Sequence, residues 1–114
     1  QIPLLSAHAR FGFDEVTLRA GGYALALALV VYERDEEDMV NVRLGVGGVE
    51  AAPRRLTEAE ALLARQAPSR RLFREVGDAA AGMVDPVGDV HGDAAYRRDL
   101  TRAVVTRALE KTLA

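Results

Sequence analysis

Cysteine is absent from the 114 residues, and histidine occurs only at His8 and His91. The lack of cysteine excludes disulfides, thiolate nucleophiles and cysteine-ligated zinc or iron–sulfur centres within this chain. Two separated histidines without an H-E-x-x-H motif do not make a histidine-rich metal site. Asp89 and His91 could form a weak metal or acid–base pair, but we interpret Asp89 as a turn residue and His91 as bonded to a carbonyl or solvent. We expect no metal ligand here.

The chain also lacks a strong net charge and a long hydrophobic run. Fifteen basic and seventeen acidic residues leave a formal charge of −2, which provides no bulk field for nucleic acid or an anionic membrane. The longest apolar run, 23–32, is about half of the ~20 residues that a membrane-spanning helix needs. We therefore expect neither a nucleic-acid partner nor membrane insertion.

The opening stretch, QIPLLSAHARF, has no initiator methionine, no basic region and no small-residue cleavage site. It does not resemble a signal peptide, so we expect a cytoplasmic protein, and the stretch resembles the interior of a longer polypeptide. With 49% hydrophobic and 28% charged residues, the composition is that of an ordinary globular protein. Residues 1–114 are therefore expected to form a single domain.

Alternating residues predict three strands in the first half. Residues 11–18 predict a strand with a bulge near Asp14 and Glu15. Residues 23–31 place large side chains on one face and mostly alanine on the other. Alanine and leucine also suit a buried helix, but the strict alternation and the closing β-branched residues favour a strand. Residues 40–46 predict a third strand.

The charged segment 34–39 joins the second and third strands, so these two form an antiparallel hairpin. Its acidic residues could bind a cation, but calcium loops need interleaved glycine and a distal bidentate glutamate. A solvated turn is the better interpretation. Gly21 and Gly22, just before the second strand, are interpreted either as a hairpin turn or as a point where backbone passes close to another surface.

The second half has helical periodicity. Thr57 and Glu60 predict a capping box at the start of a short helix that ends before Pro68. Ser69 is expected to cap a second helix, whose apolar residues recur at helical spacing from Leu72 to Met83. Asp93 is expected to cap a third helix. The residues predicted to face inward on this third helix are Tyr96, Leu100, Ala103, Val104 and Ala108, with Arg97, Arg98, Arg102 and Arg107 on the flanks.

Strands followed by helices indicate an α+β fold, in which a three-stranded antiparallel sheet is followed by three helices packed on one face (a β3-α3 sandwich). If the large side chains of 23–31 face the helices, Ala24, Ala26 and Ala28 face outward. That alanine surface could meet another domain or solvent, and both readings stay open.

No catalytic motif is present. The segment 45–50, GVGGVE, lacks the lysine of a phosphate-binding loop and does not lead into a helix as a dinucleotide fingerprint does. No serine lies in a G-x-S-x-G context. We expect no catalytic residue in this chain.

Four stretches resemble, in order and spacing, the C-terminal domain of the FAD-binding medium subunit of molybdenum hydroxylases, a family that includes aerobic carbon monoxide dehydrogenase. They are FDEVTLRAGGYALALALVV, VRLGVGGVEAAPRRLTEAEALL, DPVGDVHGDAAYRRDL and RALEKTLA. The most specific is DVHGDAAYRRDL, which is similar to the family's Gly-Ser-Ala-Glu-Tyr-Arg-Arg ending. The next is the stretch from Gly47 to Arg55.

The resemblance implies an electron-transfer role as part of a multi-subunit oxidoreductase. FAD would be held mainly by a preceding domain outside this chain, so the 114 residues would be a C-terminal fragment of a longer flavoprotein subunit. The partners implied are a molybdenum-cofactor large subunit and an iron–sulfur small subunit. The alternative hypothesis is a stand-alone protein-interaction or regulatory module without a redox role.

By the same resemblance, the segment that faces the flavin consists of Arg19, Gly21, Gly22, Tyr23 and Ala24. The family usually carries a second arginine and an acidic residue in this segment. This chain has Ala20 and Gly22 at those two places. Backbone groups and small side chains are therefore the expected contacts with the ring.

Overall fold

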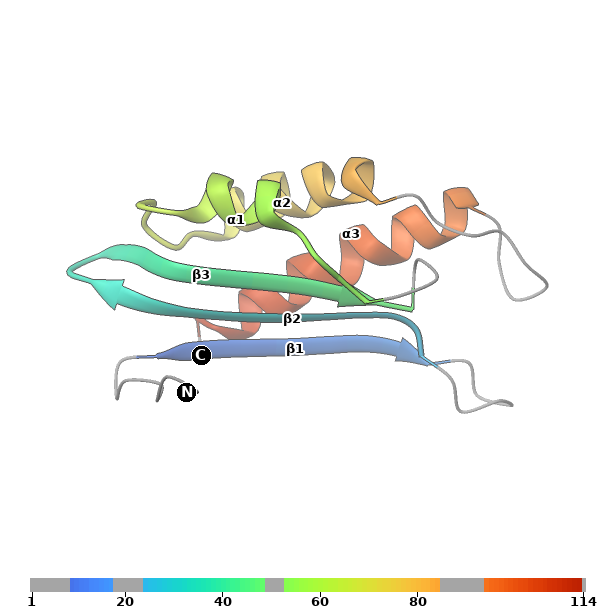
Figure 1. The fold of residues 1–114 in the computed structure, drawn as a ribbon, viewed down its shortest axis with the longest axis horizontal. Helices are drawn as coiled ribbons and strands as arrows, with labels where there is room; N and C mark the ends of the chain where they lie inside the picture. The colour runs from blue at the N-terminus through green and yellow to red at the C-terminus, as the bar shows by residue number, and fades with distance from the viewer. Residues whose placement is uncertain (1–8, 18–23, 49–52, 85–93, 114) are drawn as a thin grey trace.

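The computed structural model describes residues 9–17, 24–48, 53–84 and 94–113, which form one sheet and three helices (Figure 1). The strands are β1 Arg10–Thr17, β2 Ala24–Asp35, β3 Asp38–Gly47 and β4 Arg54–Arg55; the helices are α1 Thr57–Leu63, α2 Arg70–Met83 and α3 Ala94–Lys111. The sheet has the order β1-β2-β3-β4 with antiparallel neighbours. The α+β fold is confirmed. The sheet has a fourth strand that alternation did not predict, because two residues are too few to show a period.

The predicted hairpin is also confirmed. β2 ends at Asp35, β3 begins at Asp38, and the turn residue Glu36 has a φ of 59°. The bulge predicted near Asp14 and Glu15 is wrong in position, since those residues pair regularly with Ala28 and Leu27. The irregularity in β1 lies between Val16 and Thr17.

β2 turns its small side chains toward the helices. Ala26 and Ala28 are fully buried, whereas Leu29 is 46% exposed. The arrangement in which the leucines face the helices, considered above, is therefore wrong. The reason is the close approach of α3, because a Cβ on Gly12 of β1 would overlap the carbonyl oxygen of Ala108. Alanine and glycine on the inner face leave room for this approach.

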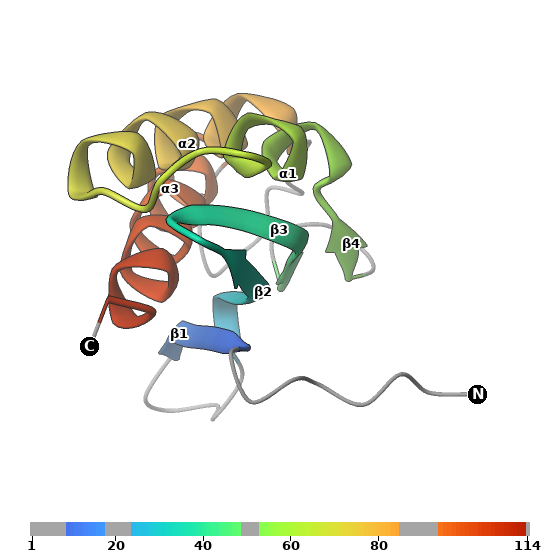
Figure 2. The same cartoon turned by 90° about the vertical axis from the view of Figure 1, so that its left-hand side faces the viewer.

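The helices cover one face of the sheet. α3 contacts β1 and β2, while α1 contacts β3, and α2 packs on both other helices (Figure 2). The core between the layers is filled mainly by aliphatic residues from all three helices and from β2 and β3. Its largest fully buried side chains are Tyr32, Met39, Leu44, Leu56, Leu63, Phe73 and Leu109. None of the described helices is long and apolar enough to span a bilayer.

The predicted caps have different outcomes. Ser69 caps α2 as expected, with its Oγ accepting a hydrogen bond of 3.1 Å from the Leu72 N–H. The capping box is wrong: Leu56 is the N-cap of α1 and no side chain caps it. The Glu60 carboxylate instead bonds Arg55 and the N–H of Leu44, so the tertiary contacts override the local motif. Asp93 lies outside the described residues.

The inward face of α3 is also corrected. Val104 and Ala108 are buried as predicted, but Tyr96 is 46% exposed and Arg97 is only 5% exposed. A shift of one residue rotates a helix face by about 100°. Arg97 can be buried because its Nη1 donates to the Gly48 carbonyl at 2.8 Å. A prediction based on polarity alone therefore placed this arginine on the wrong side.

Candidate docking surface

The face of the sheet opposite the helices is apolar across its centre. Phe11 of β1 pairs with Val31 of β2, and Phe13 pairs with Leu29, while Val31 and Leu29 pair with Arg43 and Gly45 of β3. Residues directly opposite each other in a sheet point to the same side. We call this surface the outer face and define it by Phe11, Phe13, Leu27, Leu29, Val31, Arg43 and Gly45.

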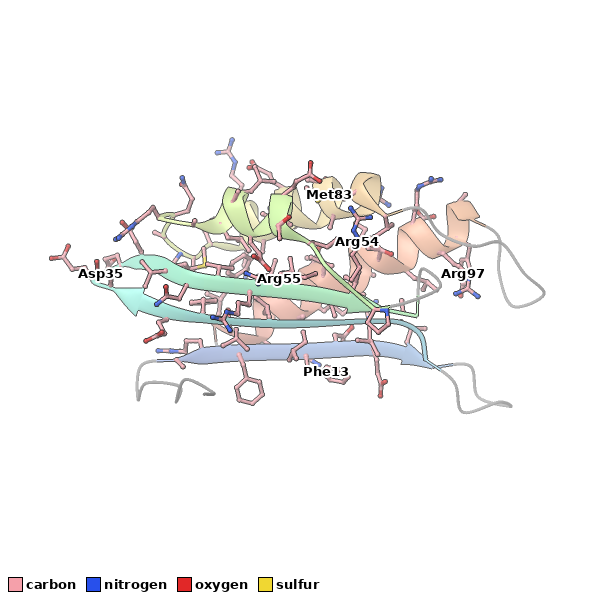
Figure 3. All side chains as sticks on the ribbon, viewed as in Figure 1. Phe13, Asp35, Arg54, Arg55, Met83 and Arg97 are labelled. Carbon is pink, nitrogen blue, oxygen red and sulfur yellow. The ribbon has the colours of Figure 1, made fainter. Side chains whose placement is uncertain are left out.

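Large side chains of the outer face are accessible to solvent. Phe11 is 67% exposed and Phe13 is 41% exposed. Leu29, which pairs with Phe13, continues this exposed surface from β1 onto β2. Figure 3 shows the Phe13 side chain pointing from β1 away from the helices. A single exposed apolar residue is ordinary, but a contiguous group marks a surface that another molecule or domain covers.

The outer face is hollowed where β3 meets β4. An open groove of about 480 Å³ is lined by residues that include Leu27, Leu29, Pro53, Arg43, Gly45 and Arg55. Gly45 lies in register between Leu29 of β2 and Arg55 of β4. The lining of the groove is therefore mainly apolar with guanidinium groups at the border. Such a groove suits an apolar segment whose polar ends meet the arginines.

Glu60 fixes the arginine at the β4 border. Its carboxylate accepts from Arg55 Nε at 2.7 Å, from Arg55 Nη2 at 2.9 Å and from the Leu44 N–H at 2.8 Å. Burial raises the pKa of Glu60, but the bonds from Arg55 and Leu44 outweigh burial and hold this pKa below its ordinary value. The carboxylate is thus charged at neutral pH and joins α1, β3 and β4.

Two further arginines hold the end of the sheet that carries the groove. Arg54 Nη1 donates to the Met83 carbonyl at 2.9 Å, which joins β4 to the end of α2 (Figure 3). Arg97 donates to the carbonyl of Gly48, just after β3. Arg43, by contrast, forms no hydrogen bond or ion pair with the residues that the structure describes. Its guanidinium is exposed on the outer face.

Most of the predicted flavin-facing segment lies outside the described residues, namely Arg19, Gly21, Gly22 and Tyr23, as do His91 and Asp89. Ala24 is the first residue of β2 and pairs with Thr17. The sequence analysis missed the outer face, because alternation shows that two faces differ without showing which one the helices cover. The useful signal was Gly12, which marks the side of β1 that α3 approaches.

The fold and this surface define an α+β domain with one sheet face covered by its own helices and the other face open. The family described as the CO dehydrogenase flavoprotein C-terminal domain matches residues 12–112. The chain belongs to this family, so the family resemblance noted in the sequence is confirmed.

Individual relatives support the same family assignment. The 6-hydroxypseudooxynicotine dehydrogenase complex subunit alpha of Paenarthrobacter nicotinovorans is 34% identical over 98% of this chain and 38% of its own length. The nicotine 6-hydroxylase medium subunit of the same organism is 29% identical over 87% of this chain and 35% of its own length. Among solved structures, carbon monoxide dehydrogenase from Hydrogenophaga pseudoflava has a TM-score of 0.89 at 25% identity, covering 98% of this chain and 39% of that chain.

These relatives are subunits of multi-subunit oxidoreductases, and the solved one is a form of the enzyme that lacks the Mo-pyranopterin moiety of its molybdenum cofactor. The chain spans only 35% to 39% of the length of the curated relatives that it matches. The chain is thus a C-terminal flavoprotein domain of the CO dehydrogenase type.

Proposed function

We propose that this domain works as part of a longer FAD-carrying medium subunit, where it encloses one side of the flavin and helps to dock partner subunits. The observation that carries the proposal is the apolar outer face, which the domain's own helices leave uncovered in a family of flavoprotein domains. The rest of the medium subunit is the partner that we assign to this face. The domain thus contributes packing and enclosure, and no bond-making residue.

The residues of this chain fit part of the FAD and not all of it. Residues 19–24 offer backbone N–H groups and the small side chains of Gly21, Gly22 and Ala24, which suit the edge of a ring system. The chain has no glycine-rich loop of the kind that holds a dinucleotide pyrophosphate at a helix N-terminus. The main binding site of FAD therefore belongs to another part of the subunit, and we propose that this chain covers the ring.

The flavin-facing residues are proposed to be Arg19, Gly21, Gly22, Tyr23 and Ala24. The first four lie in sequence between β1 and β2, and Ala24 begins β2; these two strands supply most of the apolar side chains of the outer face. Bound FAD would supply the electron-transfer chemistry. The residues here would exclude water, orient the ring edge and present backbone N–H groups to it.

The partners are proposed to be a molybdenum-cofactor large subunit and an iron–sulfur small subunit, in keeping with relatives that are subunits of multi-subunit enzymes. Exposed arginines on the helical side, such as Arg74 and Arg98, are available for carboxylates of those subunits. A cytoplasmic location stays a prediction from the sequence.

The experiment compares this 114-residue chain with the longer polypeptide that contains it. We expect a stoichiometric flavin absorption spectrum from the longer polypeptide and none from the chain alone. In the flavin-loaded polypeptide, Tyr23→Ala should change flavin fluorescence and reduction potential, whereas Leu62→Ala, at an exposed position of α1, should change neither. A stand-alone module would show no flavin in either polypeptide, and tight FAD binding by the chain alone would contradict the division of labour.

A further inference from the structure

Among the residues that the structure describes, nothing requires glycine at position 45. It lies in the interior of β3 and does not adopt a positive φ. A Cβ at this position would meet only the carbonyl oxygen of Arg54, at an ordinary van der Waals distance of 3.6 Å. Glycine weakens a strand, and its presence there often marks a site where a ligand or another backbone approaches closely.

Other glycines show what an internal reason looks like. A Cβ on Gly12 would overlap the carbonyl oxygen of Ala108, and a Cβ on Gly77 would overlap the side chain of Thr106. Gly47 faces Leu27, whose side chain would lie 3.2 Å from a Cβ. A Cβ on Gly82, which is exposed in the last turn of α2, would meet no described atom within 4 Å. Gly82 lies on a helix and not on the outer face, so it provides a matched control.

Gly45 also lines the groove, between Leu29 of β2 and Arg55 of β4. Leu29, its partner on β2, and Pro53 provide apolar walls, and the exposed ring of Phe13 continues this surface onto β1. A missing side chain in the lining of a mainly apolar groove leaves space for a group that enters from outside.

We propose that Gly45 is the contact point where an apolar segment of the flavin-binding part of the medium subunit seats against the sheet. This inference rests on the proposed function. The occupant must be apolar where it meets Leu29, Phe13 and Pro53, and it must offer polar groups to Arg43 and Arg55 beside them. It must come close enough to contact the backbone of β3, because glycine has no side chain that would keep it away. The curated relatives are more than twice the length of this chain, so a polypeptide of sufficient size is part of the same subunit.

The test uses a reporter cysteine, because the chain has none of its own. Leu29→Cys is introduced into the flavin-loaded medium subunit and into the chain alone, and its labelling by a maleimide is followed on the corresponding peptide by mass spectrometry. We expect rapid labelling in the chain alone and slow labelling in the whole subunit, where the reporter reacts only when the seat opens.

Gly45→Ala and Gly45→Leu are then added to the reporter, with Gly82→Leu as the control. In the whole subunit we expect Gly45→Leu to raise the labelling rate about tenfold, the factor that corresponds to about 1.4 kcal/mol of overpacking. Gly45→Ala should give a smaller increase in the same direction, and Gly82→Leu none. In the chain alone, the urea midpoint of Gly45→Ala should not fall, which separates the loss of docking from misfolding.

The outcomes discriminate among the occupants. Fast labelling of the reporter in an unmodified, flavin-loaded subunit would overturn the inference while leaving the flavin role intact. Equal labelling rates in the Gly45 and Gly82 variants would also overturn it. Slow labelling in the isolated chain would assign the seat to a second copy of this chain instead. A whole subunit without flavin would contradict the proposed function itself.

Discussion

Replacing Glu60 should destabilise the domain because one carboxylate holds three elements together. Glu60→Ala removes the acceptor of the buried Leu44 N–H, and an unsatisfied buried donor costs about 1 to 3 kcal/mol. The release of Arg55 adds little, since that side chain is more than half exposed. We therefore expect a loss of about 2 kcal/mol for Glu60→Ala.

Urea unfolding of the chain, followed by circular dichroism, measures this loss. With a slope of about 1 to 3 kcal/mol per molar urea, the midpoint should fall by roughly 0.7 to 2 M for Glu60→Ala. Glu60→Gln should lose less, because an amide carbonyl can still accept from Leu44. A midpoint for Glu60→Ala within about 0.2 M of the parent would refute the account of this site.

The pH dependence has a defined direction. The pKa of Glu60 is lower in the folded chain than in the unfolded one, so its contribution is complete above the unfolded pKa of about 4.3. That contribution is lost as the pH falls through the lower, folded pKa. The stability difference between the parent and Glu60→Gln should therefore stay constant from pH 7 to about pH 5 and shrink below about pH 4. A difference that grows on acidification would contradict the sign.

Four other substitutions test the helix–sheet packing, the α2 cap and a buried hydrogen bond, each by the same unfolding measurement. Gly12→Ala should cost about 1 to 3 kcal/mol because β1 and α3 must separate, and an unchanged midpoint would mean that they are not in contact. Ser69→Ala should cost about 1 kcal/mol through the lost α2 cap, whereas Thr57→Ala should cost less because Thr57 caps nothing. Tyr32→Phe should cost about 1 kcal/mol through its bond to Thr112, whose hydroxyl still donates to Leu109. A neutral Tyr32→Phe would argue against that buried bond.

The fold could be predicted from the sequence where a period was long enough to read. The alternation of β2 and β3 and the apolar spacing of α2 are regular over several residues, and each produced the predicted element. The orientation of β2 could not be predicted, because large side chains on one face and small ones on the other are compatible with either face being covered. The distance between α3 and the sheet decided it, and that distance depends on Gly12 and Ala108, which are far apart in sequence.

The roles of two charged residues were missed for a related reason. Glu60 fits a capping box locally, but Arg55 and Leu44 offer its carboxylate stronger tertiary partners. Arg97 looks like a flank residue until the Gly48 carbonyl is brought beside it. In both cases the partner lies on another element, and a pattern within one helix does not contain that information. The family resemblance, in contrast, depended on quoted motifs and was confirmed over residues 12–112.

The central claim is that another part of a medium subunit covers the outer face, and hydroxyl-radical footprinting tests it most directly. Phe73, fully buried, and Tyr96, on the exposed side of α3, serve as internal references for protected and accessible rings. In the chain alone, Phe11 and Phe13 should be oxidised at rates near that of Tyr96. In the flavin-loaded subunit, the account predicts that both fall toward the rate of Phe73 while Tyr96 is unchanged. Phe11 and Phe13 that remain as reactive in the whole subunit as in the chain alone would contradict it.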